Sequence, residues 1–414
     1  MLLMLQYFPT PYPDELWYSV LGRYHVRSGN PNSATTLREL FGEESVGGMG
    51  NFLPNCGIRR VAEKLPEGVL DERDIALHHT LFPYTFRFQD LATKEKLLEQ
   101  ALNEKVKFPI KLPKPYTSTV LKYCPLCMRE DRERYGEAYW HVTHQIPYVT
   151  ICTKHRCRLR MKDDMKKWTL NDNLFLPMDE EEIEADLDIT ETEAELSGIL
   201  VKYQELPIEK GPMETHNNLY EGLLNSDYGI ARKDKNFSID YKSVETDLLE
   251  RFGKDFIEEH FGTPVMRAAI FGNIRNWNYK LPERYAILSA LIHQDPEVTF
   301  SEERLENKMV SLFLRMSKEP MIRSKKYVAR SLGVKEKHLD ILAHNLNVVP
   351  FWEQKPDAER AKEYRGYVCF MEDEWAYVQD SVSKYGFQSS SAFIRFCVGQ
   401  YRDREEVDHA FHNK

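Results

Sequence analysis

Apolar side chains recur at helical spacing through the first hundred residues. The chain opens with an extended arm, because Pro9, Pro11 and Pro13 each fix the backbone and remove a hydrogen-bond donor. Helical spacing then predicts a first helix over residues 15–26, with Asp14 as its N-cap. Further helices are predicted over residues 33–41, 58–65, 71–79 and 93–105. The pattern indicates a helical N-terminal domain.

Helical patterning returns over residues 211–320. The segment 285–292 is apolar almost all round, which predicts a buried core helix that starts at Pro282 and stops before Asp295-Pro296. Residues 325–345 fit a helix-turn-helix: a small residue stands where two helices would cross, a glycine stands at the turn, and apolar residues follow at buried positions. These positions are Ala329, Gly333, Val334, Leu339 and Leu342. A helical hairpin that does not bind DNA is the alternative.

A third pattern closes the chain. A short alternating strand over residues 367–371 precedes a helix over residues 373–385, which Gly386 ends, and Ser389 or Ser390 starts another helix. This order resembles a ribbon-helix-helix domain, whose strand pairs with that of a second copy and enters the major groove. Neither face of the strand is basic, so dimerisation or packing is at least as good an interpretation as base readout.

The predicted fold is therefore mainly α and multi-domain. It comprises a helical N-terminal domain, a small zinc-finger module, a helical domain with a helix-turn-helix, and a C-terminal ribbon-helix-helix-like unit. The predicted boundaries are 1–118 for the N-terminal domain, 119–178 for the zinc module, 179–210 for an acidic linker, 211–350 for the helical domain and 351–414 for the C-terminal unit.

Composition adds two constraints. The opening segment is neither a signal peptide nor a membrane span, and seven cysteines, an odd number, favour reduced thiols in a bacterial cytoplasm. The net charge of −9 would disfavour nucleic-acid binding, but residues 179–195 hold ten acidic residues and no basic one. The rest of the chain is near neutral. The acidic run is a solvated linker or helix face, or else an intramolecular mimic of DNA or a docking strip for a partner.

Metal-ligand spacing is the strongest chemical signal. Cys124 and Cys127 form a C-x2-C pair, Cys152 and His155 form a C-x2-H pair, and 24 residues separate the two pairs. Two-residue spacers let tight turns present their ligands to a common point, which predicts a closed, structural Cys3His zinc site. His141, His144 and Cys157 lie nearby and could substitute for a ligand, but they lack that spacing and are expected on the surface or in packing.

Basic residues suggest two nucleic-acid contacts. Lys154, Arg156, Arg158, Arg160 and Lys162 alternate, so one face of an extended strand would present them all to phosphates or, alternatively, to solvent at a strand edge. In the helix-turn-helix interpretation, the second helix enters the major groove and the start of the first lies near phosphates. The base-facing residues would be Lys335, Glu336, Lys337, Asp340 and His344, and those near phosphates Lys325, Lys326 and Tyr327.

Three ordered motifs over about the first 160 residues resemble the TnsD/TniQ family of target selectors from Tn7-like transposons. They are Phe8-Pro9-x-Pro11-Tyr12-x-x-Glu15-Leu16-x-Tyr18-Ser19, His79-Thr80-Leu81-Phe82-Pro83, and Tyr123-Cys124-Pro125 with the string from Arg134 to Trp140 and Cys152 to His155. The resemblance implies that the N-terminal segment engages the AAA+ ATPase TnsC. The residues carried over for that contact are Phe8, Pro9, Pro11, Tyr12, Glu15, Leu16 and Tyr18.

The expected function is non-enzymatic: a target-selection protein that binds double-stranded DNA and recruits TnsC and the transposase. One alternative is a TniQ-type adaptor that links a CRISPR effector complex to TnsC without reading DNA itself. A distant alternative is a zinc-containing nucleic-acid enzyme, but a deaminase needs an H-x-E segment that the sequence lacks. The C-terminal unit is a candidate for homodimer formation, and no membrane contact is expected.

Overall fold

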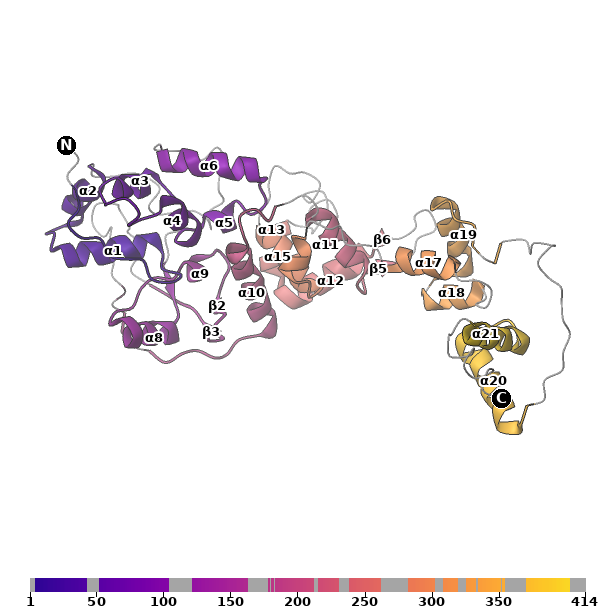
Figure 1. Ribbon diagram of the computed structural model, residues 1–414. Helices are drawn as coiled ribbons and strands as arrows, with labels where there is room; N and C mark the ends of the chain where they lie inside the picture. The colour runs from indigo at the N-terminus through magenta and orange to yellow at the C-terminus, as the bar shows by residue number, and fades with distance from the viewer. Residues whose placement is uncertain are drawn as a thin grey trace, which may run out of the picture. The chain divides into compact units, whose positions relative to one another are not determined.

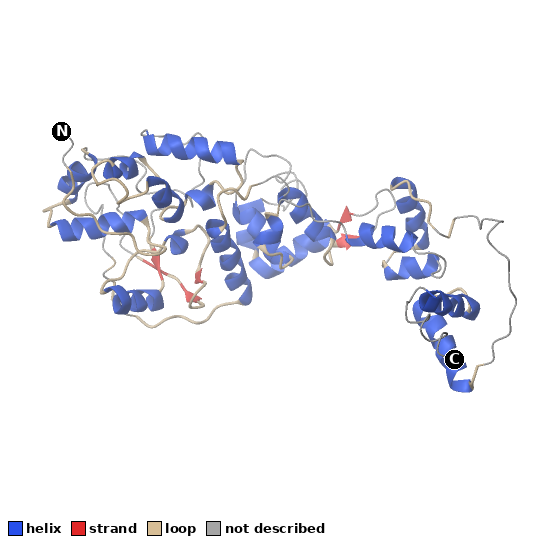
Figure 2. Cartoon of the chain, in the orientation of Figure 1, coloured by secondary structure: helices blue, strands red, loops and turns tan. Residues whose placement is uncertain are grey.

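The structure is a computed structural model in which helices dominate and the strands are short (Figure 2). It describes residues 4–42, 52–103, 121–162, 178, 180–181, 183–211, 215–230, 238–261, 282–301, 308–318, 325–332, 334–350, 352–353 and 370–402. None of the helices in these ranges combines the length and apolar character that crossing a bilayer requires. The mainly helical fold class is confirmed.

The chain divides into two compact units, one formed by Met1–Tyr220 with Glu245–Arg304 and the other by Glu221–Val244 with Leu305–Lys414. The helices of the first unit are α1 (Trp17–Ser28), α2 (Ser33–Phe41), α3 (Cys56–Ala62), α4 (Glu72–His78), α5 (Phe82–Thr85), α6 (Leu91–Asn103), α8 (Pro125–Tyr135), α9 (Val142–Gln145), α10 (Glu191–Glu205), α13 (Lys254–Phe261), α15 (Pro282–Leu291) and α16 (Pro296–Thr299). Its strands are β1 (Lys122–Tyr123), β2 (Ile151–Cys152), β3 (Cys157–Arg158) and β4 (Arg160–Met161). The division into five domains stays a prediction.

The second unit holds β5 (Gly229–Ile230), β6 (Ser238–Ile239), α17 (Lys308–Lys318), α18 (Lys325–Ser331), α19 (Glu336–Asn345), α20 (Glu372–Tyr385) and α21 (Ser390–Arg402). Two helices, α11 (Thr215–Leu224) and α12 (Tyr241–Phe252), cross the boundary between the units. The strands pair only as antiparallel ladders, β1 with β4, β2 with β3 and β5 with β6.

The first helices follow the predicted pattern, with one correction at the start. Helix α2 covers the predicted residues, because Asn32 caps its N-terminus and Gly42 ends it in the left-handed conformation. Helix α1 begins two residues later than predicted and has no side-chain cap. Asp14 does not cap it, since the Asp14 carboxylate instead accepts hydrogen bonds from Thr143. The other predicted N-terminal helices appear as α3, α4 and α6, with ends shifted by one to three residues.

Helix α10 lies within the residues that the sequence assigns to a linker. Its N-terminus carries a capping box between Thr190 and Glu193, and it packs against α5 and α15 (Figure 1). Leu200 and Tyr203 are fully buried in this packing. Arg87, also fully buried, donates hydrogen bonds to the carbonyl oxygens of Tyr203 and Leu206 at the end of the helix. One side of α10, from Leu196 to Gln204, is therefore part of the core.

Two further predictions of helices are confirmed. Helix α15 starts at Pro282 and is buried on nearly all sides, as its apolar pattern predicts. In the second unit, α18 and α19 pack together through Ala329, Leu339 and Leu342, which are buried. Gly333 and residues 367–369 of the predicted strand lie outside the described residues.

The C-terminal helices form as the pattern predicts. Helix α20 ends at Gly386, which is left-handed, and α21 begins at Ser390 and packs against α20. At the N-terminus of α20, Met371 is 71% exposed. The ribbon-helix-helix assignment stays a prediction.

Candidate metal centre

The four predicted zinc ligands come from two tight local structures. Cys124 caps α8, since its sulfur accepts a hydrogen bond from the backbone N–H of Cys127, and Pro125 starts the helix. Cys152 ends β2, and His155 lies in the turn that leads into β3. Arg156 adopts a left-handed conformation, with φ of 49°, to close this turn. Each pair thus presents its ligands over one turn of chain.

The two pairs meet. The ligand atoms of Cys124, Cys127, Cys152 and His155 all lie within 4.8 Å of one another, and the three thiols are buried. The Nδ1 atom of His155 is 3.5 Å from the sulfur of Cys124, 3.3 Å from that of Cys127 and 3.7 Å from that of Cys152. The sulfurs of Cys127 and Cys152 are 3.7 Å apart.

These separations fit a zinc ion. Zinc bonds of about 2.3 Å to sulfur and about 2.0 Å to nitrogen place tetrahedral ligands roughly 3.8 Å apart for two sulfurs and roughly 3.5 Å apart for sulfur and nitrogen. The chain would hold the ion through three thiolates and one imidazole, and the ion would supply a cross-link between α8 and the β2–β3 turn. Four protein ligands leave no position for a reacting water, so this is the donor set of a structural site.

A carboxylate orients the histidine. The Nε2 atom of His155 lies 2.9 Å from the Oε1 atom of Glu130, which leaves Nδ1 directed at the three thiols. Lys154 pairs with the same carboxylate, and both neighbours lower the pKa of Glu130, the contribution of Lys154 being the larger. A carboxylate that accepts the second N–H of a ligating histidine fixes its tautomer and strengthens the ligand.

Two of the residues expected on the surface or in packing are buried and pack against the centre. Cys157 is fully buried, with its sulfur 3.3 Å from that of Cys124, and His144 has its Nε2 atom 3.9 Å from the sulfur of Cys127. Burial lowers the pKa of His144, so its imidazole is neutral. Neither residue completes a set of four with the short mutual distances of the predicted ligands. Within the described part of the chain, the predicted four form the one such group.

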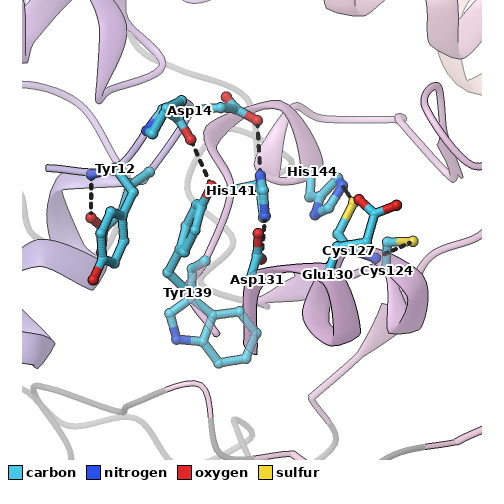
Figure 3. Close-up of polar contacts among 12 residues, drawn as sticks. Tyr12, Asp14, Cys124, Cys127, Glu130, Asp131, Tyr139, His141 and His144 are labelled. Atoms are coloured by element: carbon cyan, nitrogen blue, oxygen red, sulfur yellow. Dashed lines mark hydrogen bonds and ion pairs between the residues drawn. The ribbon is translucent and has the colours of Figure 1, made fainter. Parts of the chain in front are cut away.

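The N-terminal arm docks on the metal-binding region through Asp14. Its carboxylate accepts a hydrogen bond of 2.6 Å from the hydroxyl of Thr143 and lies 3.3 Å from Nδ1 of His141 (Figure 3). The other ring nitrogen of His141 lies 2.8 Å from the carboxylate of Asp131 on α8. Figure 3 shows the side chains of Asp14, His141 and Asp131 in a row, beside His144 and the thiols. Asp14 therefore joins the arm to the shell around the metal ligands.

Aromatic side chains complete this junction. Tyr12 stacks on Tyr135 with ring centroids 4.3 Å apart, and Tyr139 donates a hydrogen bond of 2.9 Å to the carbonyl oxygen of Pro13. Trp140 is fully buried, and its backbone N–H donates to the hydroxyl of Ser19. Tyr139 and Trp140 thus pack against the arm and α1.

The sequence region that carries this junction matches a known family. Residues 6–159 match the family model of TniQ. This region is therefore similar to a TniQ domain. Over 154 residues the chain is also 27% identical to the transposon Tn7 transposition protein TnsD of Escherichia coli, a match that covers 36% of this chain and 30% of that protein. The shared part thus spans about a third of each protein, and the resemblance seen in the motifs is confirmed.

The residues carried over for partner binding sit at the start of this TniQ domain. Glu15, Leu16, Tyr18 and Pro9 are buried, whereas Phe8, Pro11 and Tyr12 are half-buried. Glu15 is fully enclosed and paired with Arg23. The four buried residues therefore hold the arm in place. A contact with a partner would depend on the half-buried group and on neighbours such as Tyr7, which is 44% exposed.

The alternating basic residues do not form one strand. A strand would need extended backbone throughout, but the turn that presents His155 contains Lys154 and Arg156. Arg158 belongs to β3 and Arg160 to β4, which pair with different strands. Lys162 forms an ion pair with Glu180, whereas the Nε atom of Arg160 is buried. The prediction of a single face with five cations is wrong, because the metal-binding turn interrupts it.

The second group of candidate DNA contacts lies on α18 and α19. Lys335, Glu336, Lys337, Asp340 and His344 are all exposed along α19, as is Lys326 on α18. Lys325 and Tyr327 are half-buried, and Lys325 forms an ion pair with Asp340. The predicted base-facing residues therefore share one accessible helix, and their role stays a prediction.

Sequence reasoning missed the shell around the ligands. Asp131 and Glu130 stand on α8 one turn after the C-x2-C pair, so helical spacing was a usable signal for them. The contribution of Asp14 had no local signal, since 127 residues separate it from His141.

Proposed function

We propose that this chain selects the target site of a Tn7-like transposon: it binds target DNA and recruits the AAA+ regulator TnsC and, through it, the transposase. The observation that carries the proposal is the TniQ match over residues 6–159, which includes the arm and both halves of the closed Cys3His centre. The TnsD relative is named as a transposition protein. The match covers 36% of this chain and 30% of that protein, so every partner named here is a proposal.

The metal has a structural role in this proposal. The arm reaches the centre through Asp14, His141 and Asp131, so loss of the ion would loosen the surface on which the arm lies. TnsC would then contact the outer side of the arm, where Tyr7 and Phe8 are accessible. The inner residues would act indirectly, by holding the arm in its docked position.

Target DNA would be read by the second unit. Buried Ala329, Leu339 and Leu342 on α18 and α19 support a helix-turn-helix, although Val334 is only half-buried. Two lysines, two acidic residues and a histidine are exposed on α19 and its N-cap. From Arg315 to Lys337 there are eight basic and two acidic residues, which supplies the positive field that duplex DNA attracts. We assign α19 to the major groove, with Lys335 and Lys337 as the residues that contact DNA most strongly.

Selection of bound sequences from a randomised duplex library tests this assignment. The full chain at near-physiological salt should enrich a sequence motif, and the double variant Lys335→Ala/Lys337→Ala should lose the enrichment and reduce the salt slope of binding by about 2. Lys202→Ala/Lys242→Ala is the matched control, since both lysines are exposed and lie on α10 and α12. An unchanged motif in the α19 variant would remove this helix from the DNA interface.

The library selection, combined with a TnsC capture assay, distinguishes a protein that reads DNA directly from a TniQ-type adaptor. A folded, zinc-loaded chain that enriches no sequence, yet is captured by TnsC, would be a TniQ-type adaptor brought to DNA by another complex. Capture by TnsC should then depend on the arm, and Tyr7→Ala, a change at a side chain that is 44% exposed, should weaken it strongly while melting changes little. Capture that survives this change would place the TnsC contact elsewhere.

A further inference from the structure

The acidic segment, described over residues 180–181 and 183–193, lies along basic residues of the TniQ domain. Glu191 pairs with Arg156 and Glu193 with Arg158, each at 2.6 Å. The backbone N–H of Arg158 donates to the carbonyl oxygen of Asp186 at 2.8 Å, and its guanidinium donates to that of Asp188 at 2.7 Å. The cations that the sequence suggests for phosphate binding are thus already engaged by oxygen atoms of the same chain.

The other end of the segment repeats this arrangement. Glu180 forms an ion pair with Lys162, and its carbonyl oxygen accepts a hydrogen bond of 2.6 Å from Arg132 on α8. Four basic side chains, three of them within the TniQ match and the fourth being Lys162, therefore contact one acidic stretch through charge and hydrogen bonds.

Apolar burial contributes little to this contact. None of the large apolar residues of the segment is fully buried: Leu187 is 65% exposed, Ile183 is 37% exposed and Ile189 is half-buried. The segment is anchored at its two ends instead: Met178 is buried and bridged to Ala138, and α10 packs in the core. A stretch that is held by ends and polar contacts can leave its central position without unfolding the domain.

The contacts have the chemistry of a phosphate backbone. Arginine recognises carboxylate and phosphate oxygens with the same donor geometry, and both of the ion pairs at Arg156 and Arg158 are partly open to solvent. Exposed pairs of this kind are individually weak and are weakened further by salt. A polyanion with regularly spaced charges can therefore compete for these two arginines.

We propose that the acidic segment is an intramolecular competitor for DNA, which covers a phosphate-binding site formed by Arg156 and Arg158. The inference rests on the proposed DNA-binding function and adds a second contact to it. The site is closed in the free protein and opens when duplex DNA, first bound through α19, replaces the carboxylates. The segment then reduces binding to DNA that lacks the target sequence, because such DNA must displace the segment without base contacts to offset that cost.

Neutralising the segment tests the proposal. The variant Asp186→Asn/Glu191→Gln/Glu193→Gln neutralises the three carboxylates that face Arg156 and Arg158. It retains the oxygen of residue 186 that accepts the backbone N–H of Asp188. It should bind a fluorescent duplex without target sequence roughly tenfold more tightly at ~50 mM salt, with a salt slope steeper by about 2. Adding Arg156→Ala/Arg158→Ala should cancel the gain. The control removes three exposed carboxylates elsewhere, with the changes Glu63→Gln/Glu67→Gln/Glu133→Gln.

The outcomes separate this inference from the proposed function. An equal gain in the control, a gain that persists without the two arginines, or no gain at all would each overturn the masking proposal, while motif enrichment through α19 would still stand. Failure of every variant and of the unaltered chain to bind DNA at low salt would overturn both.

Hydrogen exchange of the unaltered chain gives a second readout. Duplex DNA should increase exchange at the N–H of Arg158, which donates to Asp186 in the closed state, and through residues 183–189. The buried part of α10 should keep its protection, since only the segment moves. Unchanged exchange at saturating DNA would show that the segment stays in place, and the proposal would fail.

Discussion

Glu15 and Arg23 form a two-point ion pair inside the TniQ domain. The Nε and Nη2 atoms of Arg23 lie 2.8 Å and 2.6 Å from the two carboxylate oxygens of Glu15, whose side chain is fully buried. The same carboxylate accepts hydrogen bonds from the hydroxyl of Ser19 and the backbone N–H of Tyr12. This pair therefore connects the arm to α1.

Glu15→Ala should destabilise the domain strongly. The change leaves the guanidinium of Arg23 buried without its main partner, which costs about 3–5 kcal/mol. The first thermal transition of the chain should fall by roughly 10 °C, since 1 kcal/mol corresponds to about 2–4 °C for a domain of this size. Differential scanning calorimetry measures the shift.

The double variant Glu15→Ala/Arg23→Met serves as its control. Removing the orphaned charge as well should recover part of the lost stability, because the remaining cost is that of a cavity and not of an unpaired ion. A single variant that melts like the unaltered chain would show that Arg23 finds a sufficient partner in Glu137, which lies 3.3 Å away.

Zinc content distinguishes the predicted ligands from their neighbour. Cys124→Ser and His155→Ala should each reduce bound zinc from about one ion per chain to well below one and lower the melting temperature, because a structural zinc site contributes directly to folding. Cys157→Ala should retain the ion, although its sulfur lies only 3.3 Å from that of Cys124. Metal analysis of the purified chains measures all three.

The opposite pattern would reassign the centre. Zinc lost from Cys157→Ala and kept in His155→Ala would make the site one of four thiolates, with His155 outside it.

The carboxylate behind His155 should tune the affinity for zinc. Glu130→Ala removes the acceptor of the Nε2 proton, and changes of this kind typically weaken metal binding about 10–100-fold. Competition with a chromogenic chelator measures the dissociation constant. Glu133→Ala, on an exposed position of the same helix, should leave it unchanged. Equal affinities in the two variants would show that Glu130 pairs with His155 without supporting the metal.

Local patterns predicted elements whose signals lie within a few residues. Helix α2 matches its prediction because Asn32 and Gly42 stop it at both ends, and α15 because its apolar residues leave no polar face. The metal ligands were predictable for the same reason, since a two-residue spacer is a local feature that only a tight turn can use. These are the parts of the protein that the chain specifies over one or two turns.

Contacts across long stretches of sequence were not predictable in this way. Asp14 has the residue type and position of a helix cap, and yet its carboxylate accepts a hydrogen bond from Thr143, 129 residues away. The acidic first turn of α10 predicts a linker. In the structure Arg156 and Arg158 pair with that turn, and the helix is buried on one side from Leu196 to Gln204. In both cases a partner from elsewhere in the fold decides how a polar side chain is used.

His141 should make the stability of the TniQ domain depend on pH. Burial alone would lower the pKa of His141, but its hydrogen bonds to Asp131 and Asp14 outweigh burial and raise the pKa to about 9. The folded state therefore binds the proton more tightly than the unfolded chain, whose histidine has a pKa of about 6.5. The stabilisation is complete below pH ~6.5 and is lost as the pH rises through about 9, and it is on the order of 3 kcal/mol.

The comparison with His141→Gln measures this contribution. Glutamine can hydrogen bond to one of the two carboxylates but carries no charge, so the unaltered chain should be more stable than the variant at pH 6.5, and the difference should shrink towards pH 9.5. Groups elsewhere that titrate in this range, such as Lys122, whose pKa burial lowers to about 7, affect both proteins equally. His78→Gln, an exposed histidine that pairs with Asp74, should show a small difference at every pH. A difference for His141→Gln that does not change between pH 6.5 and 9.5 would mean that the imidazole is held neutral between its two carboxylates.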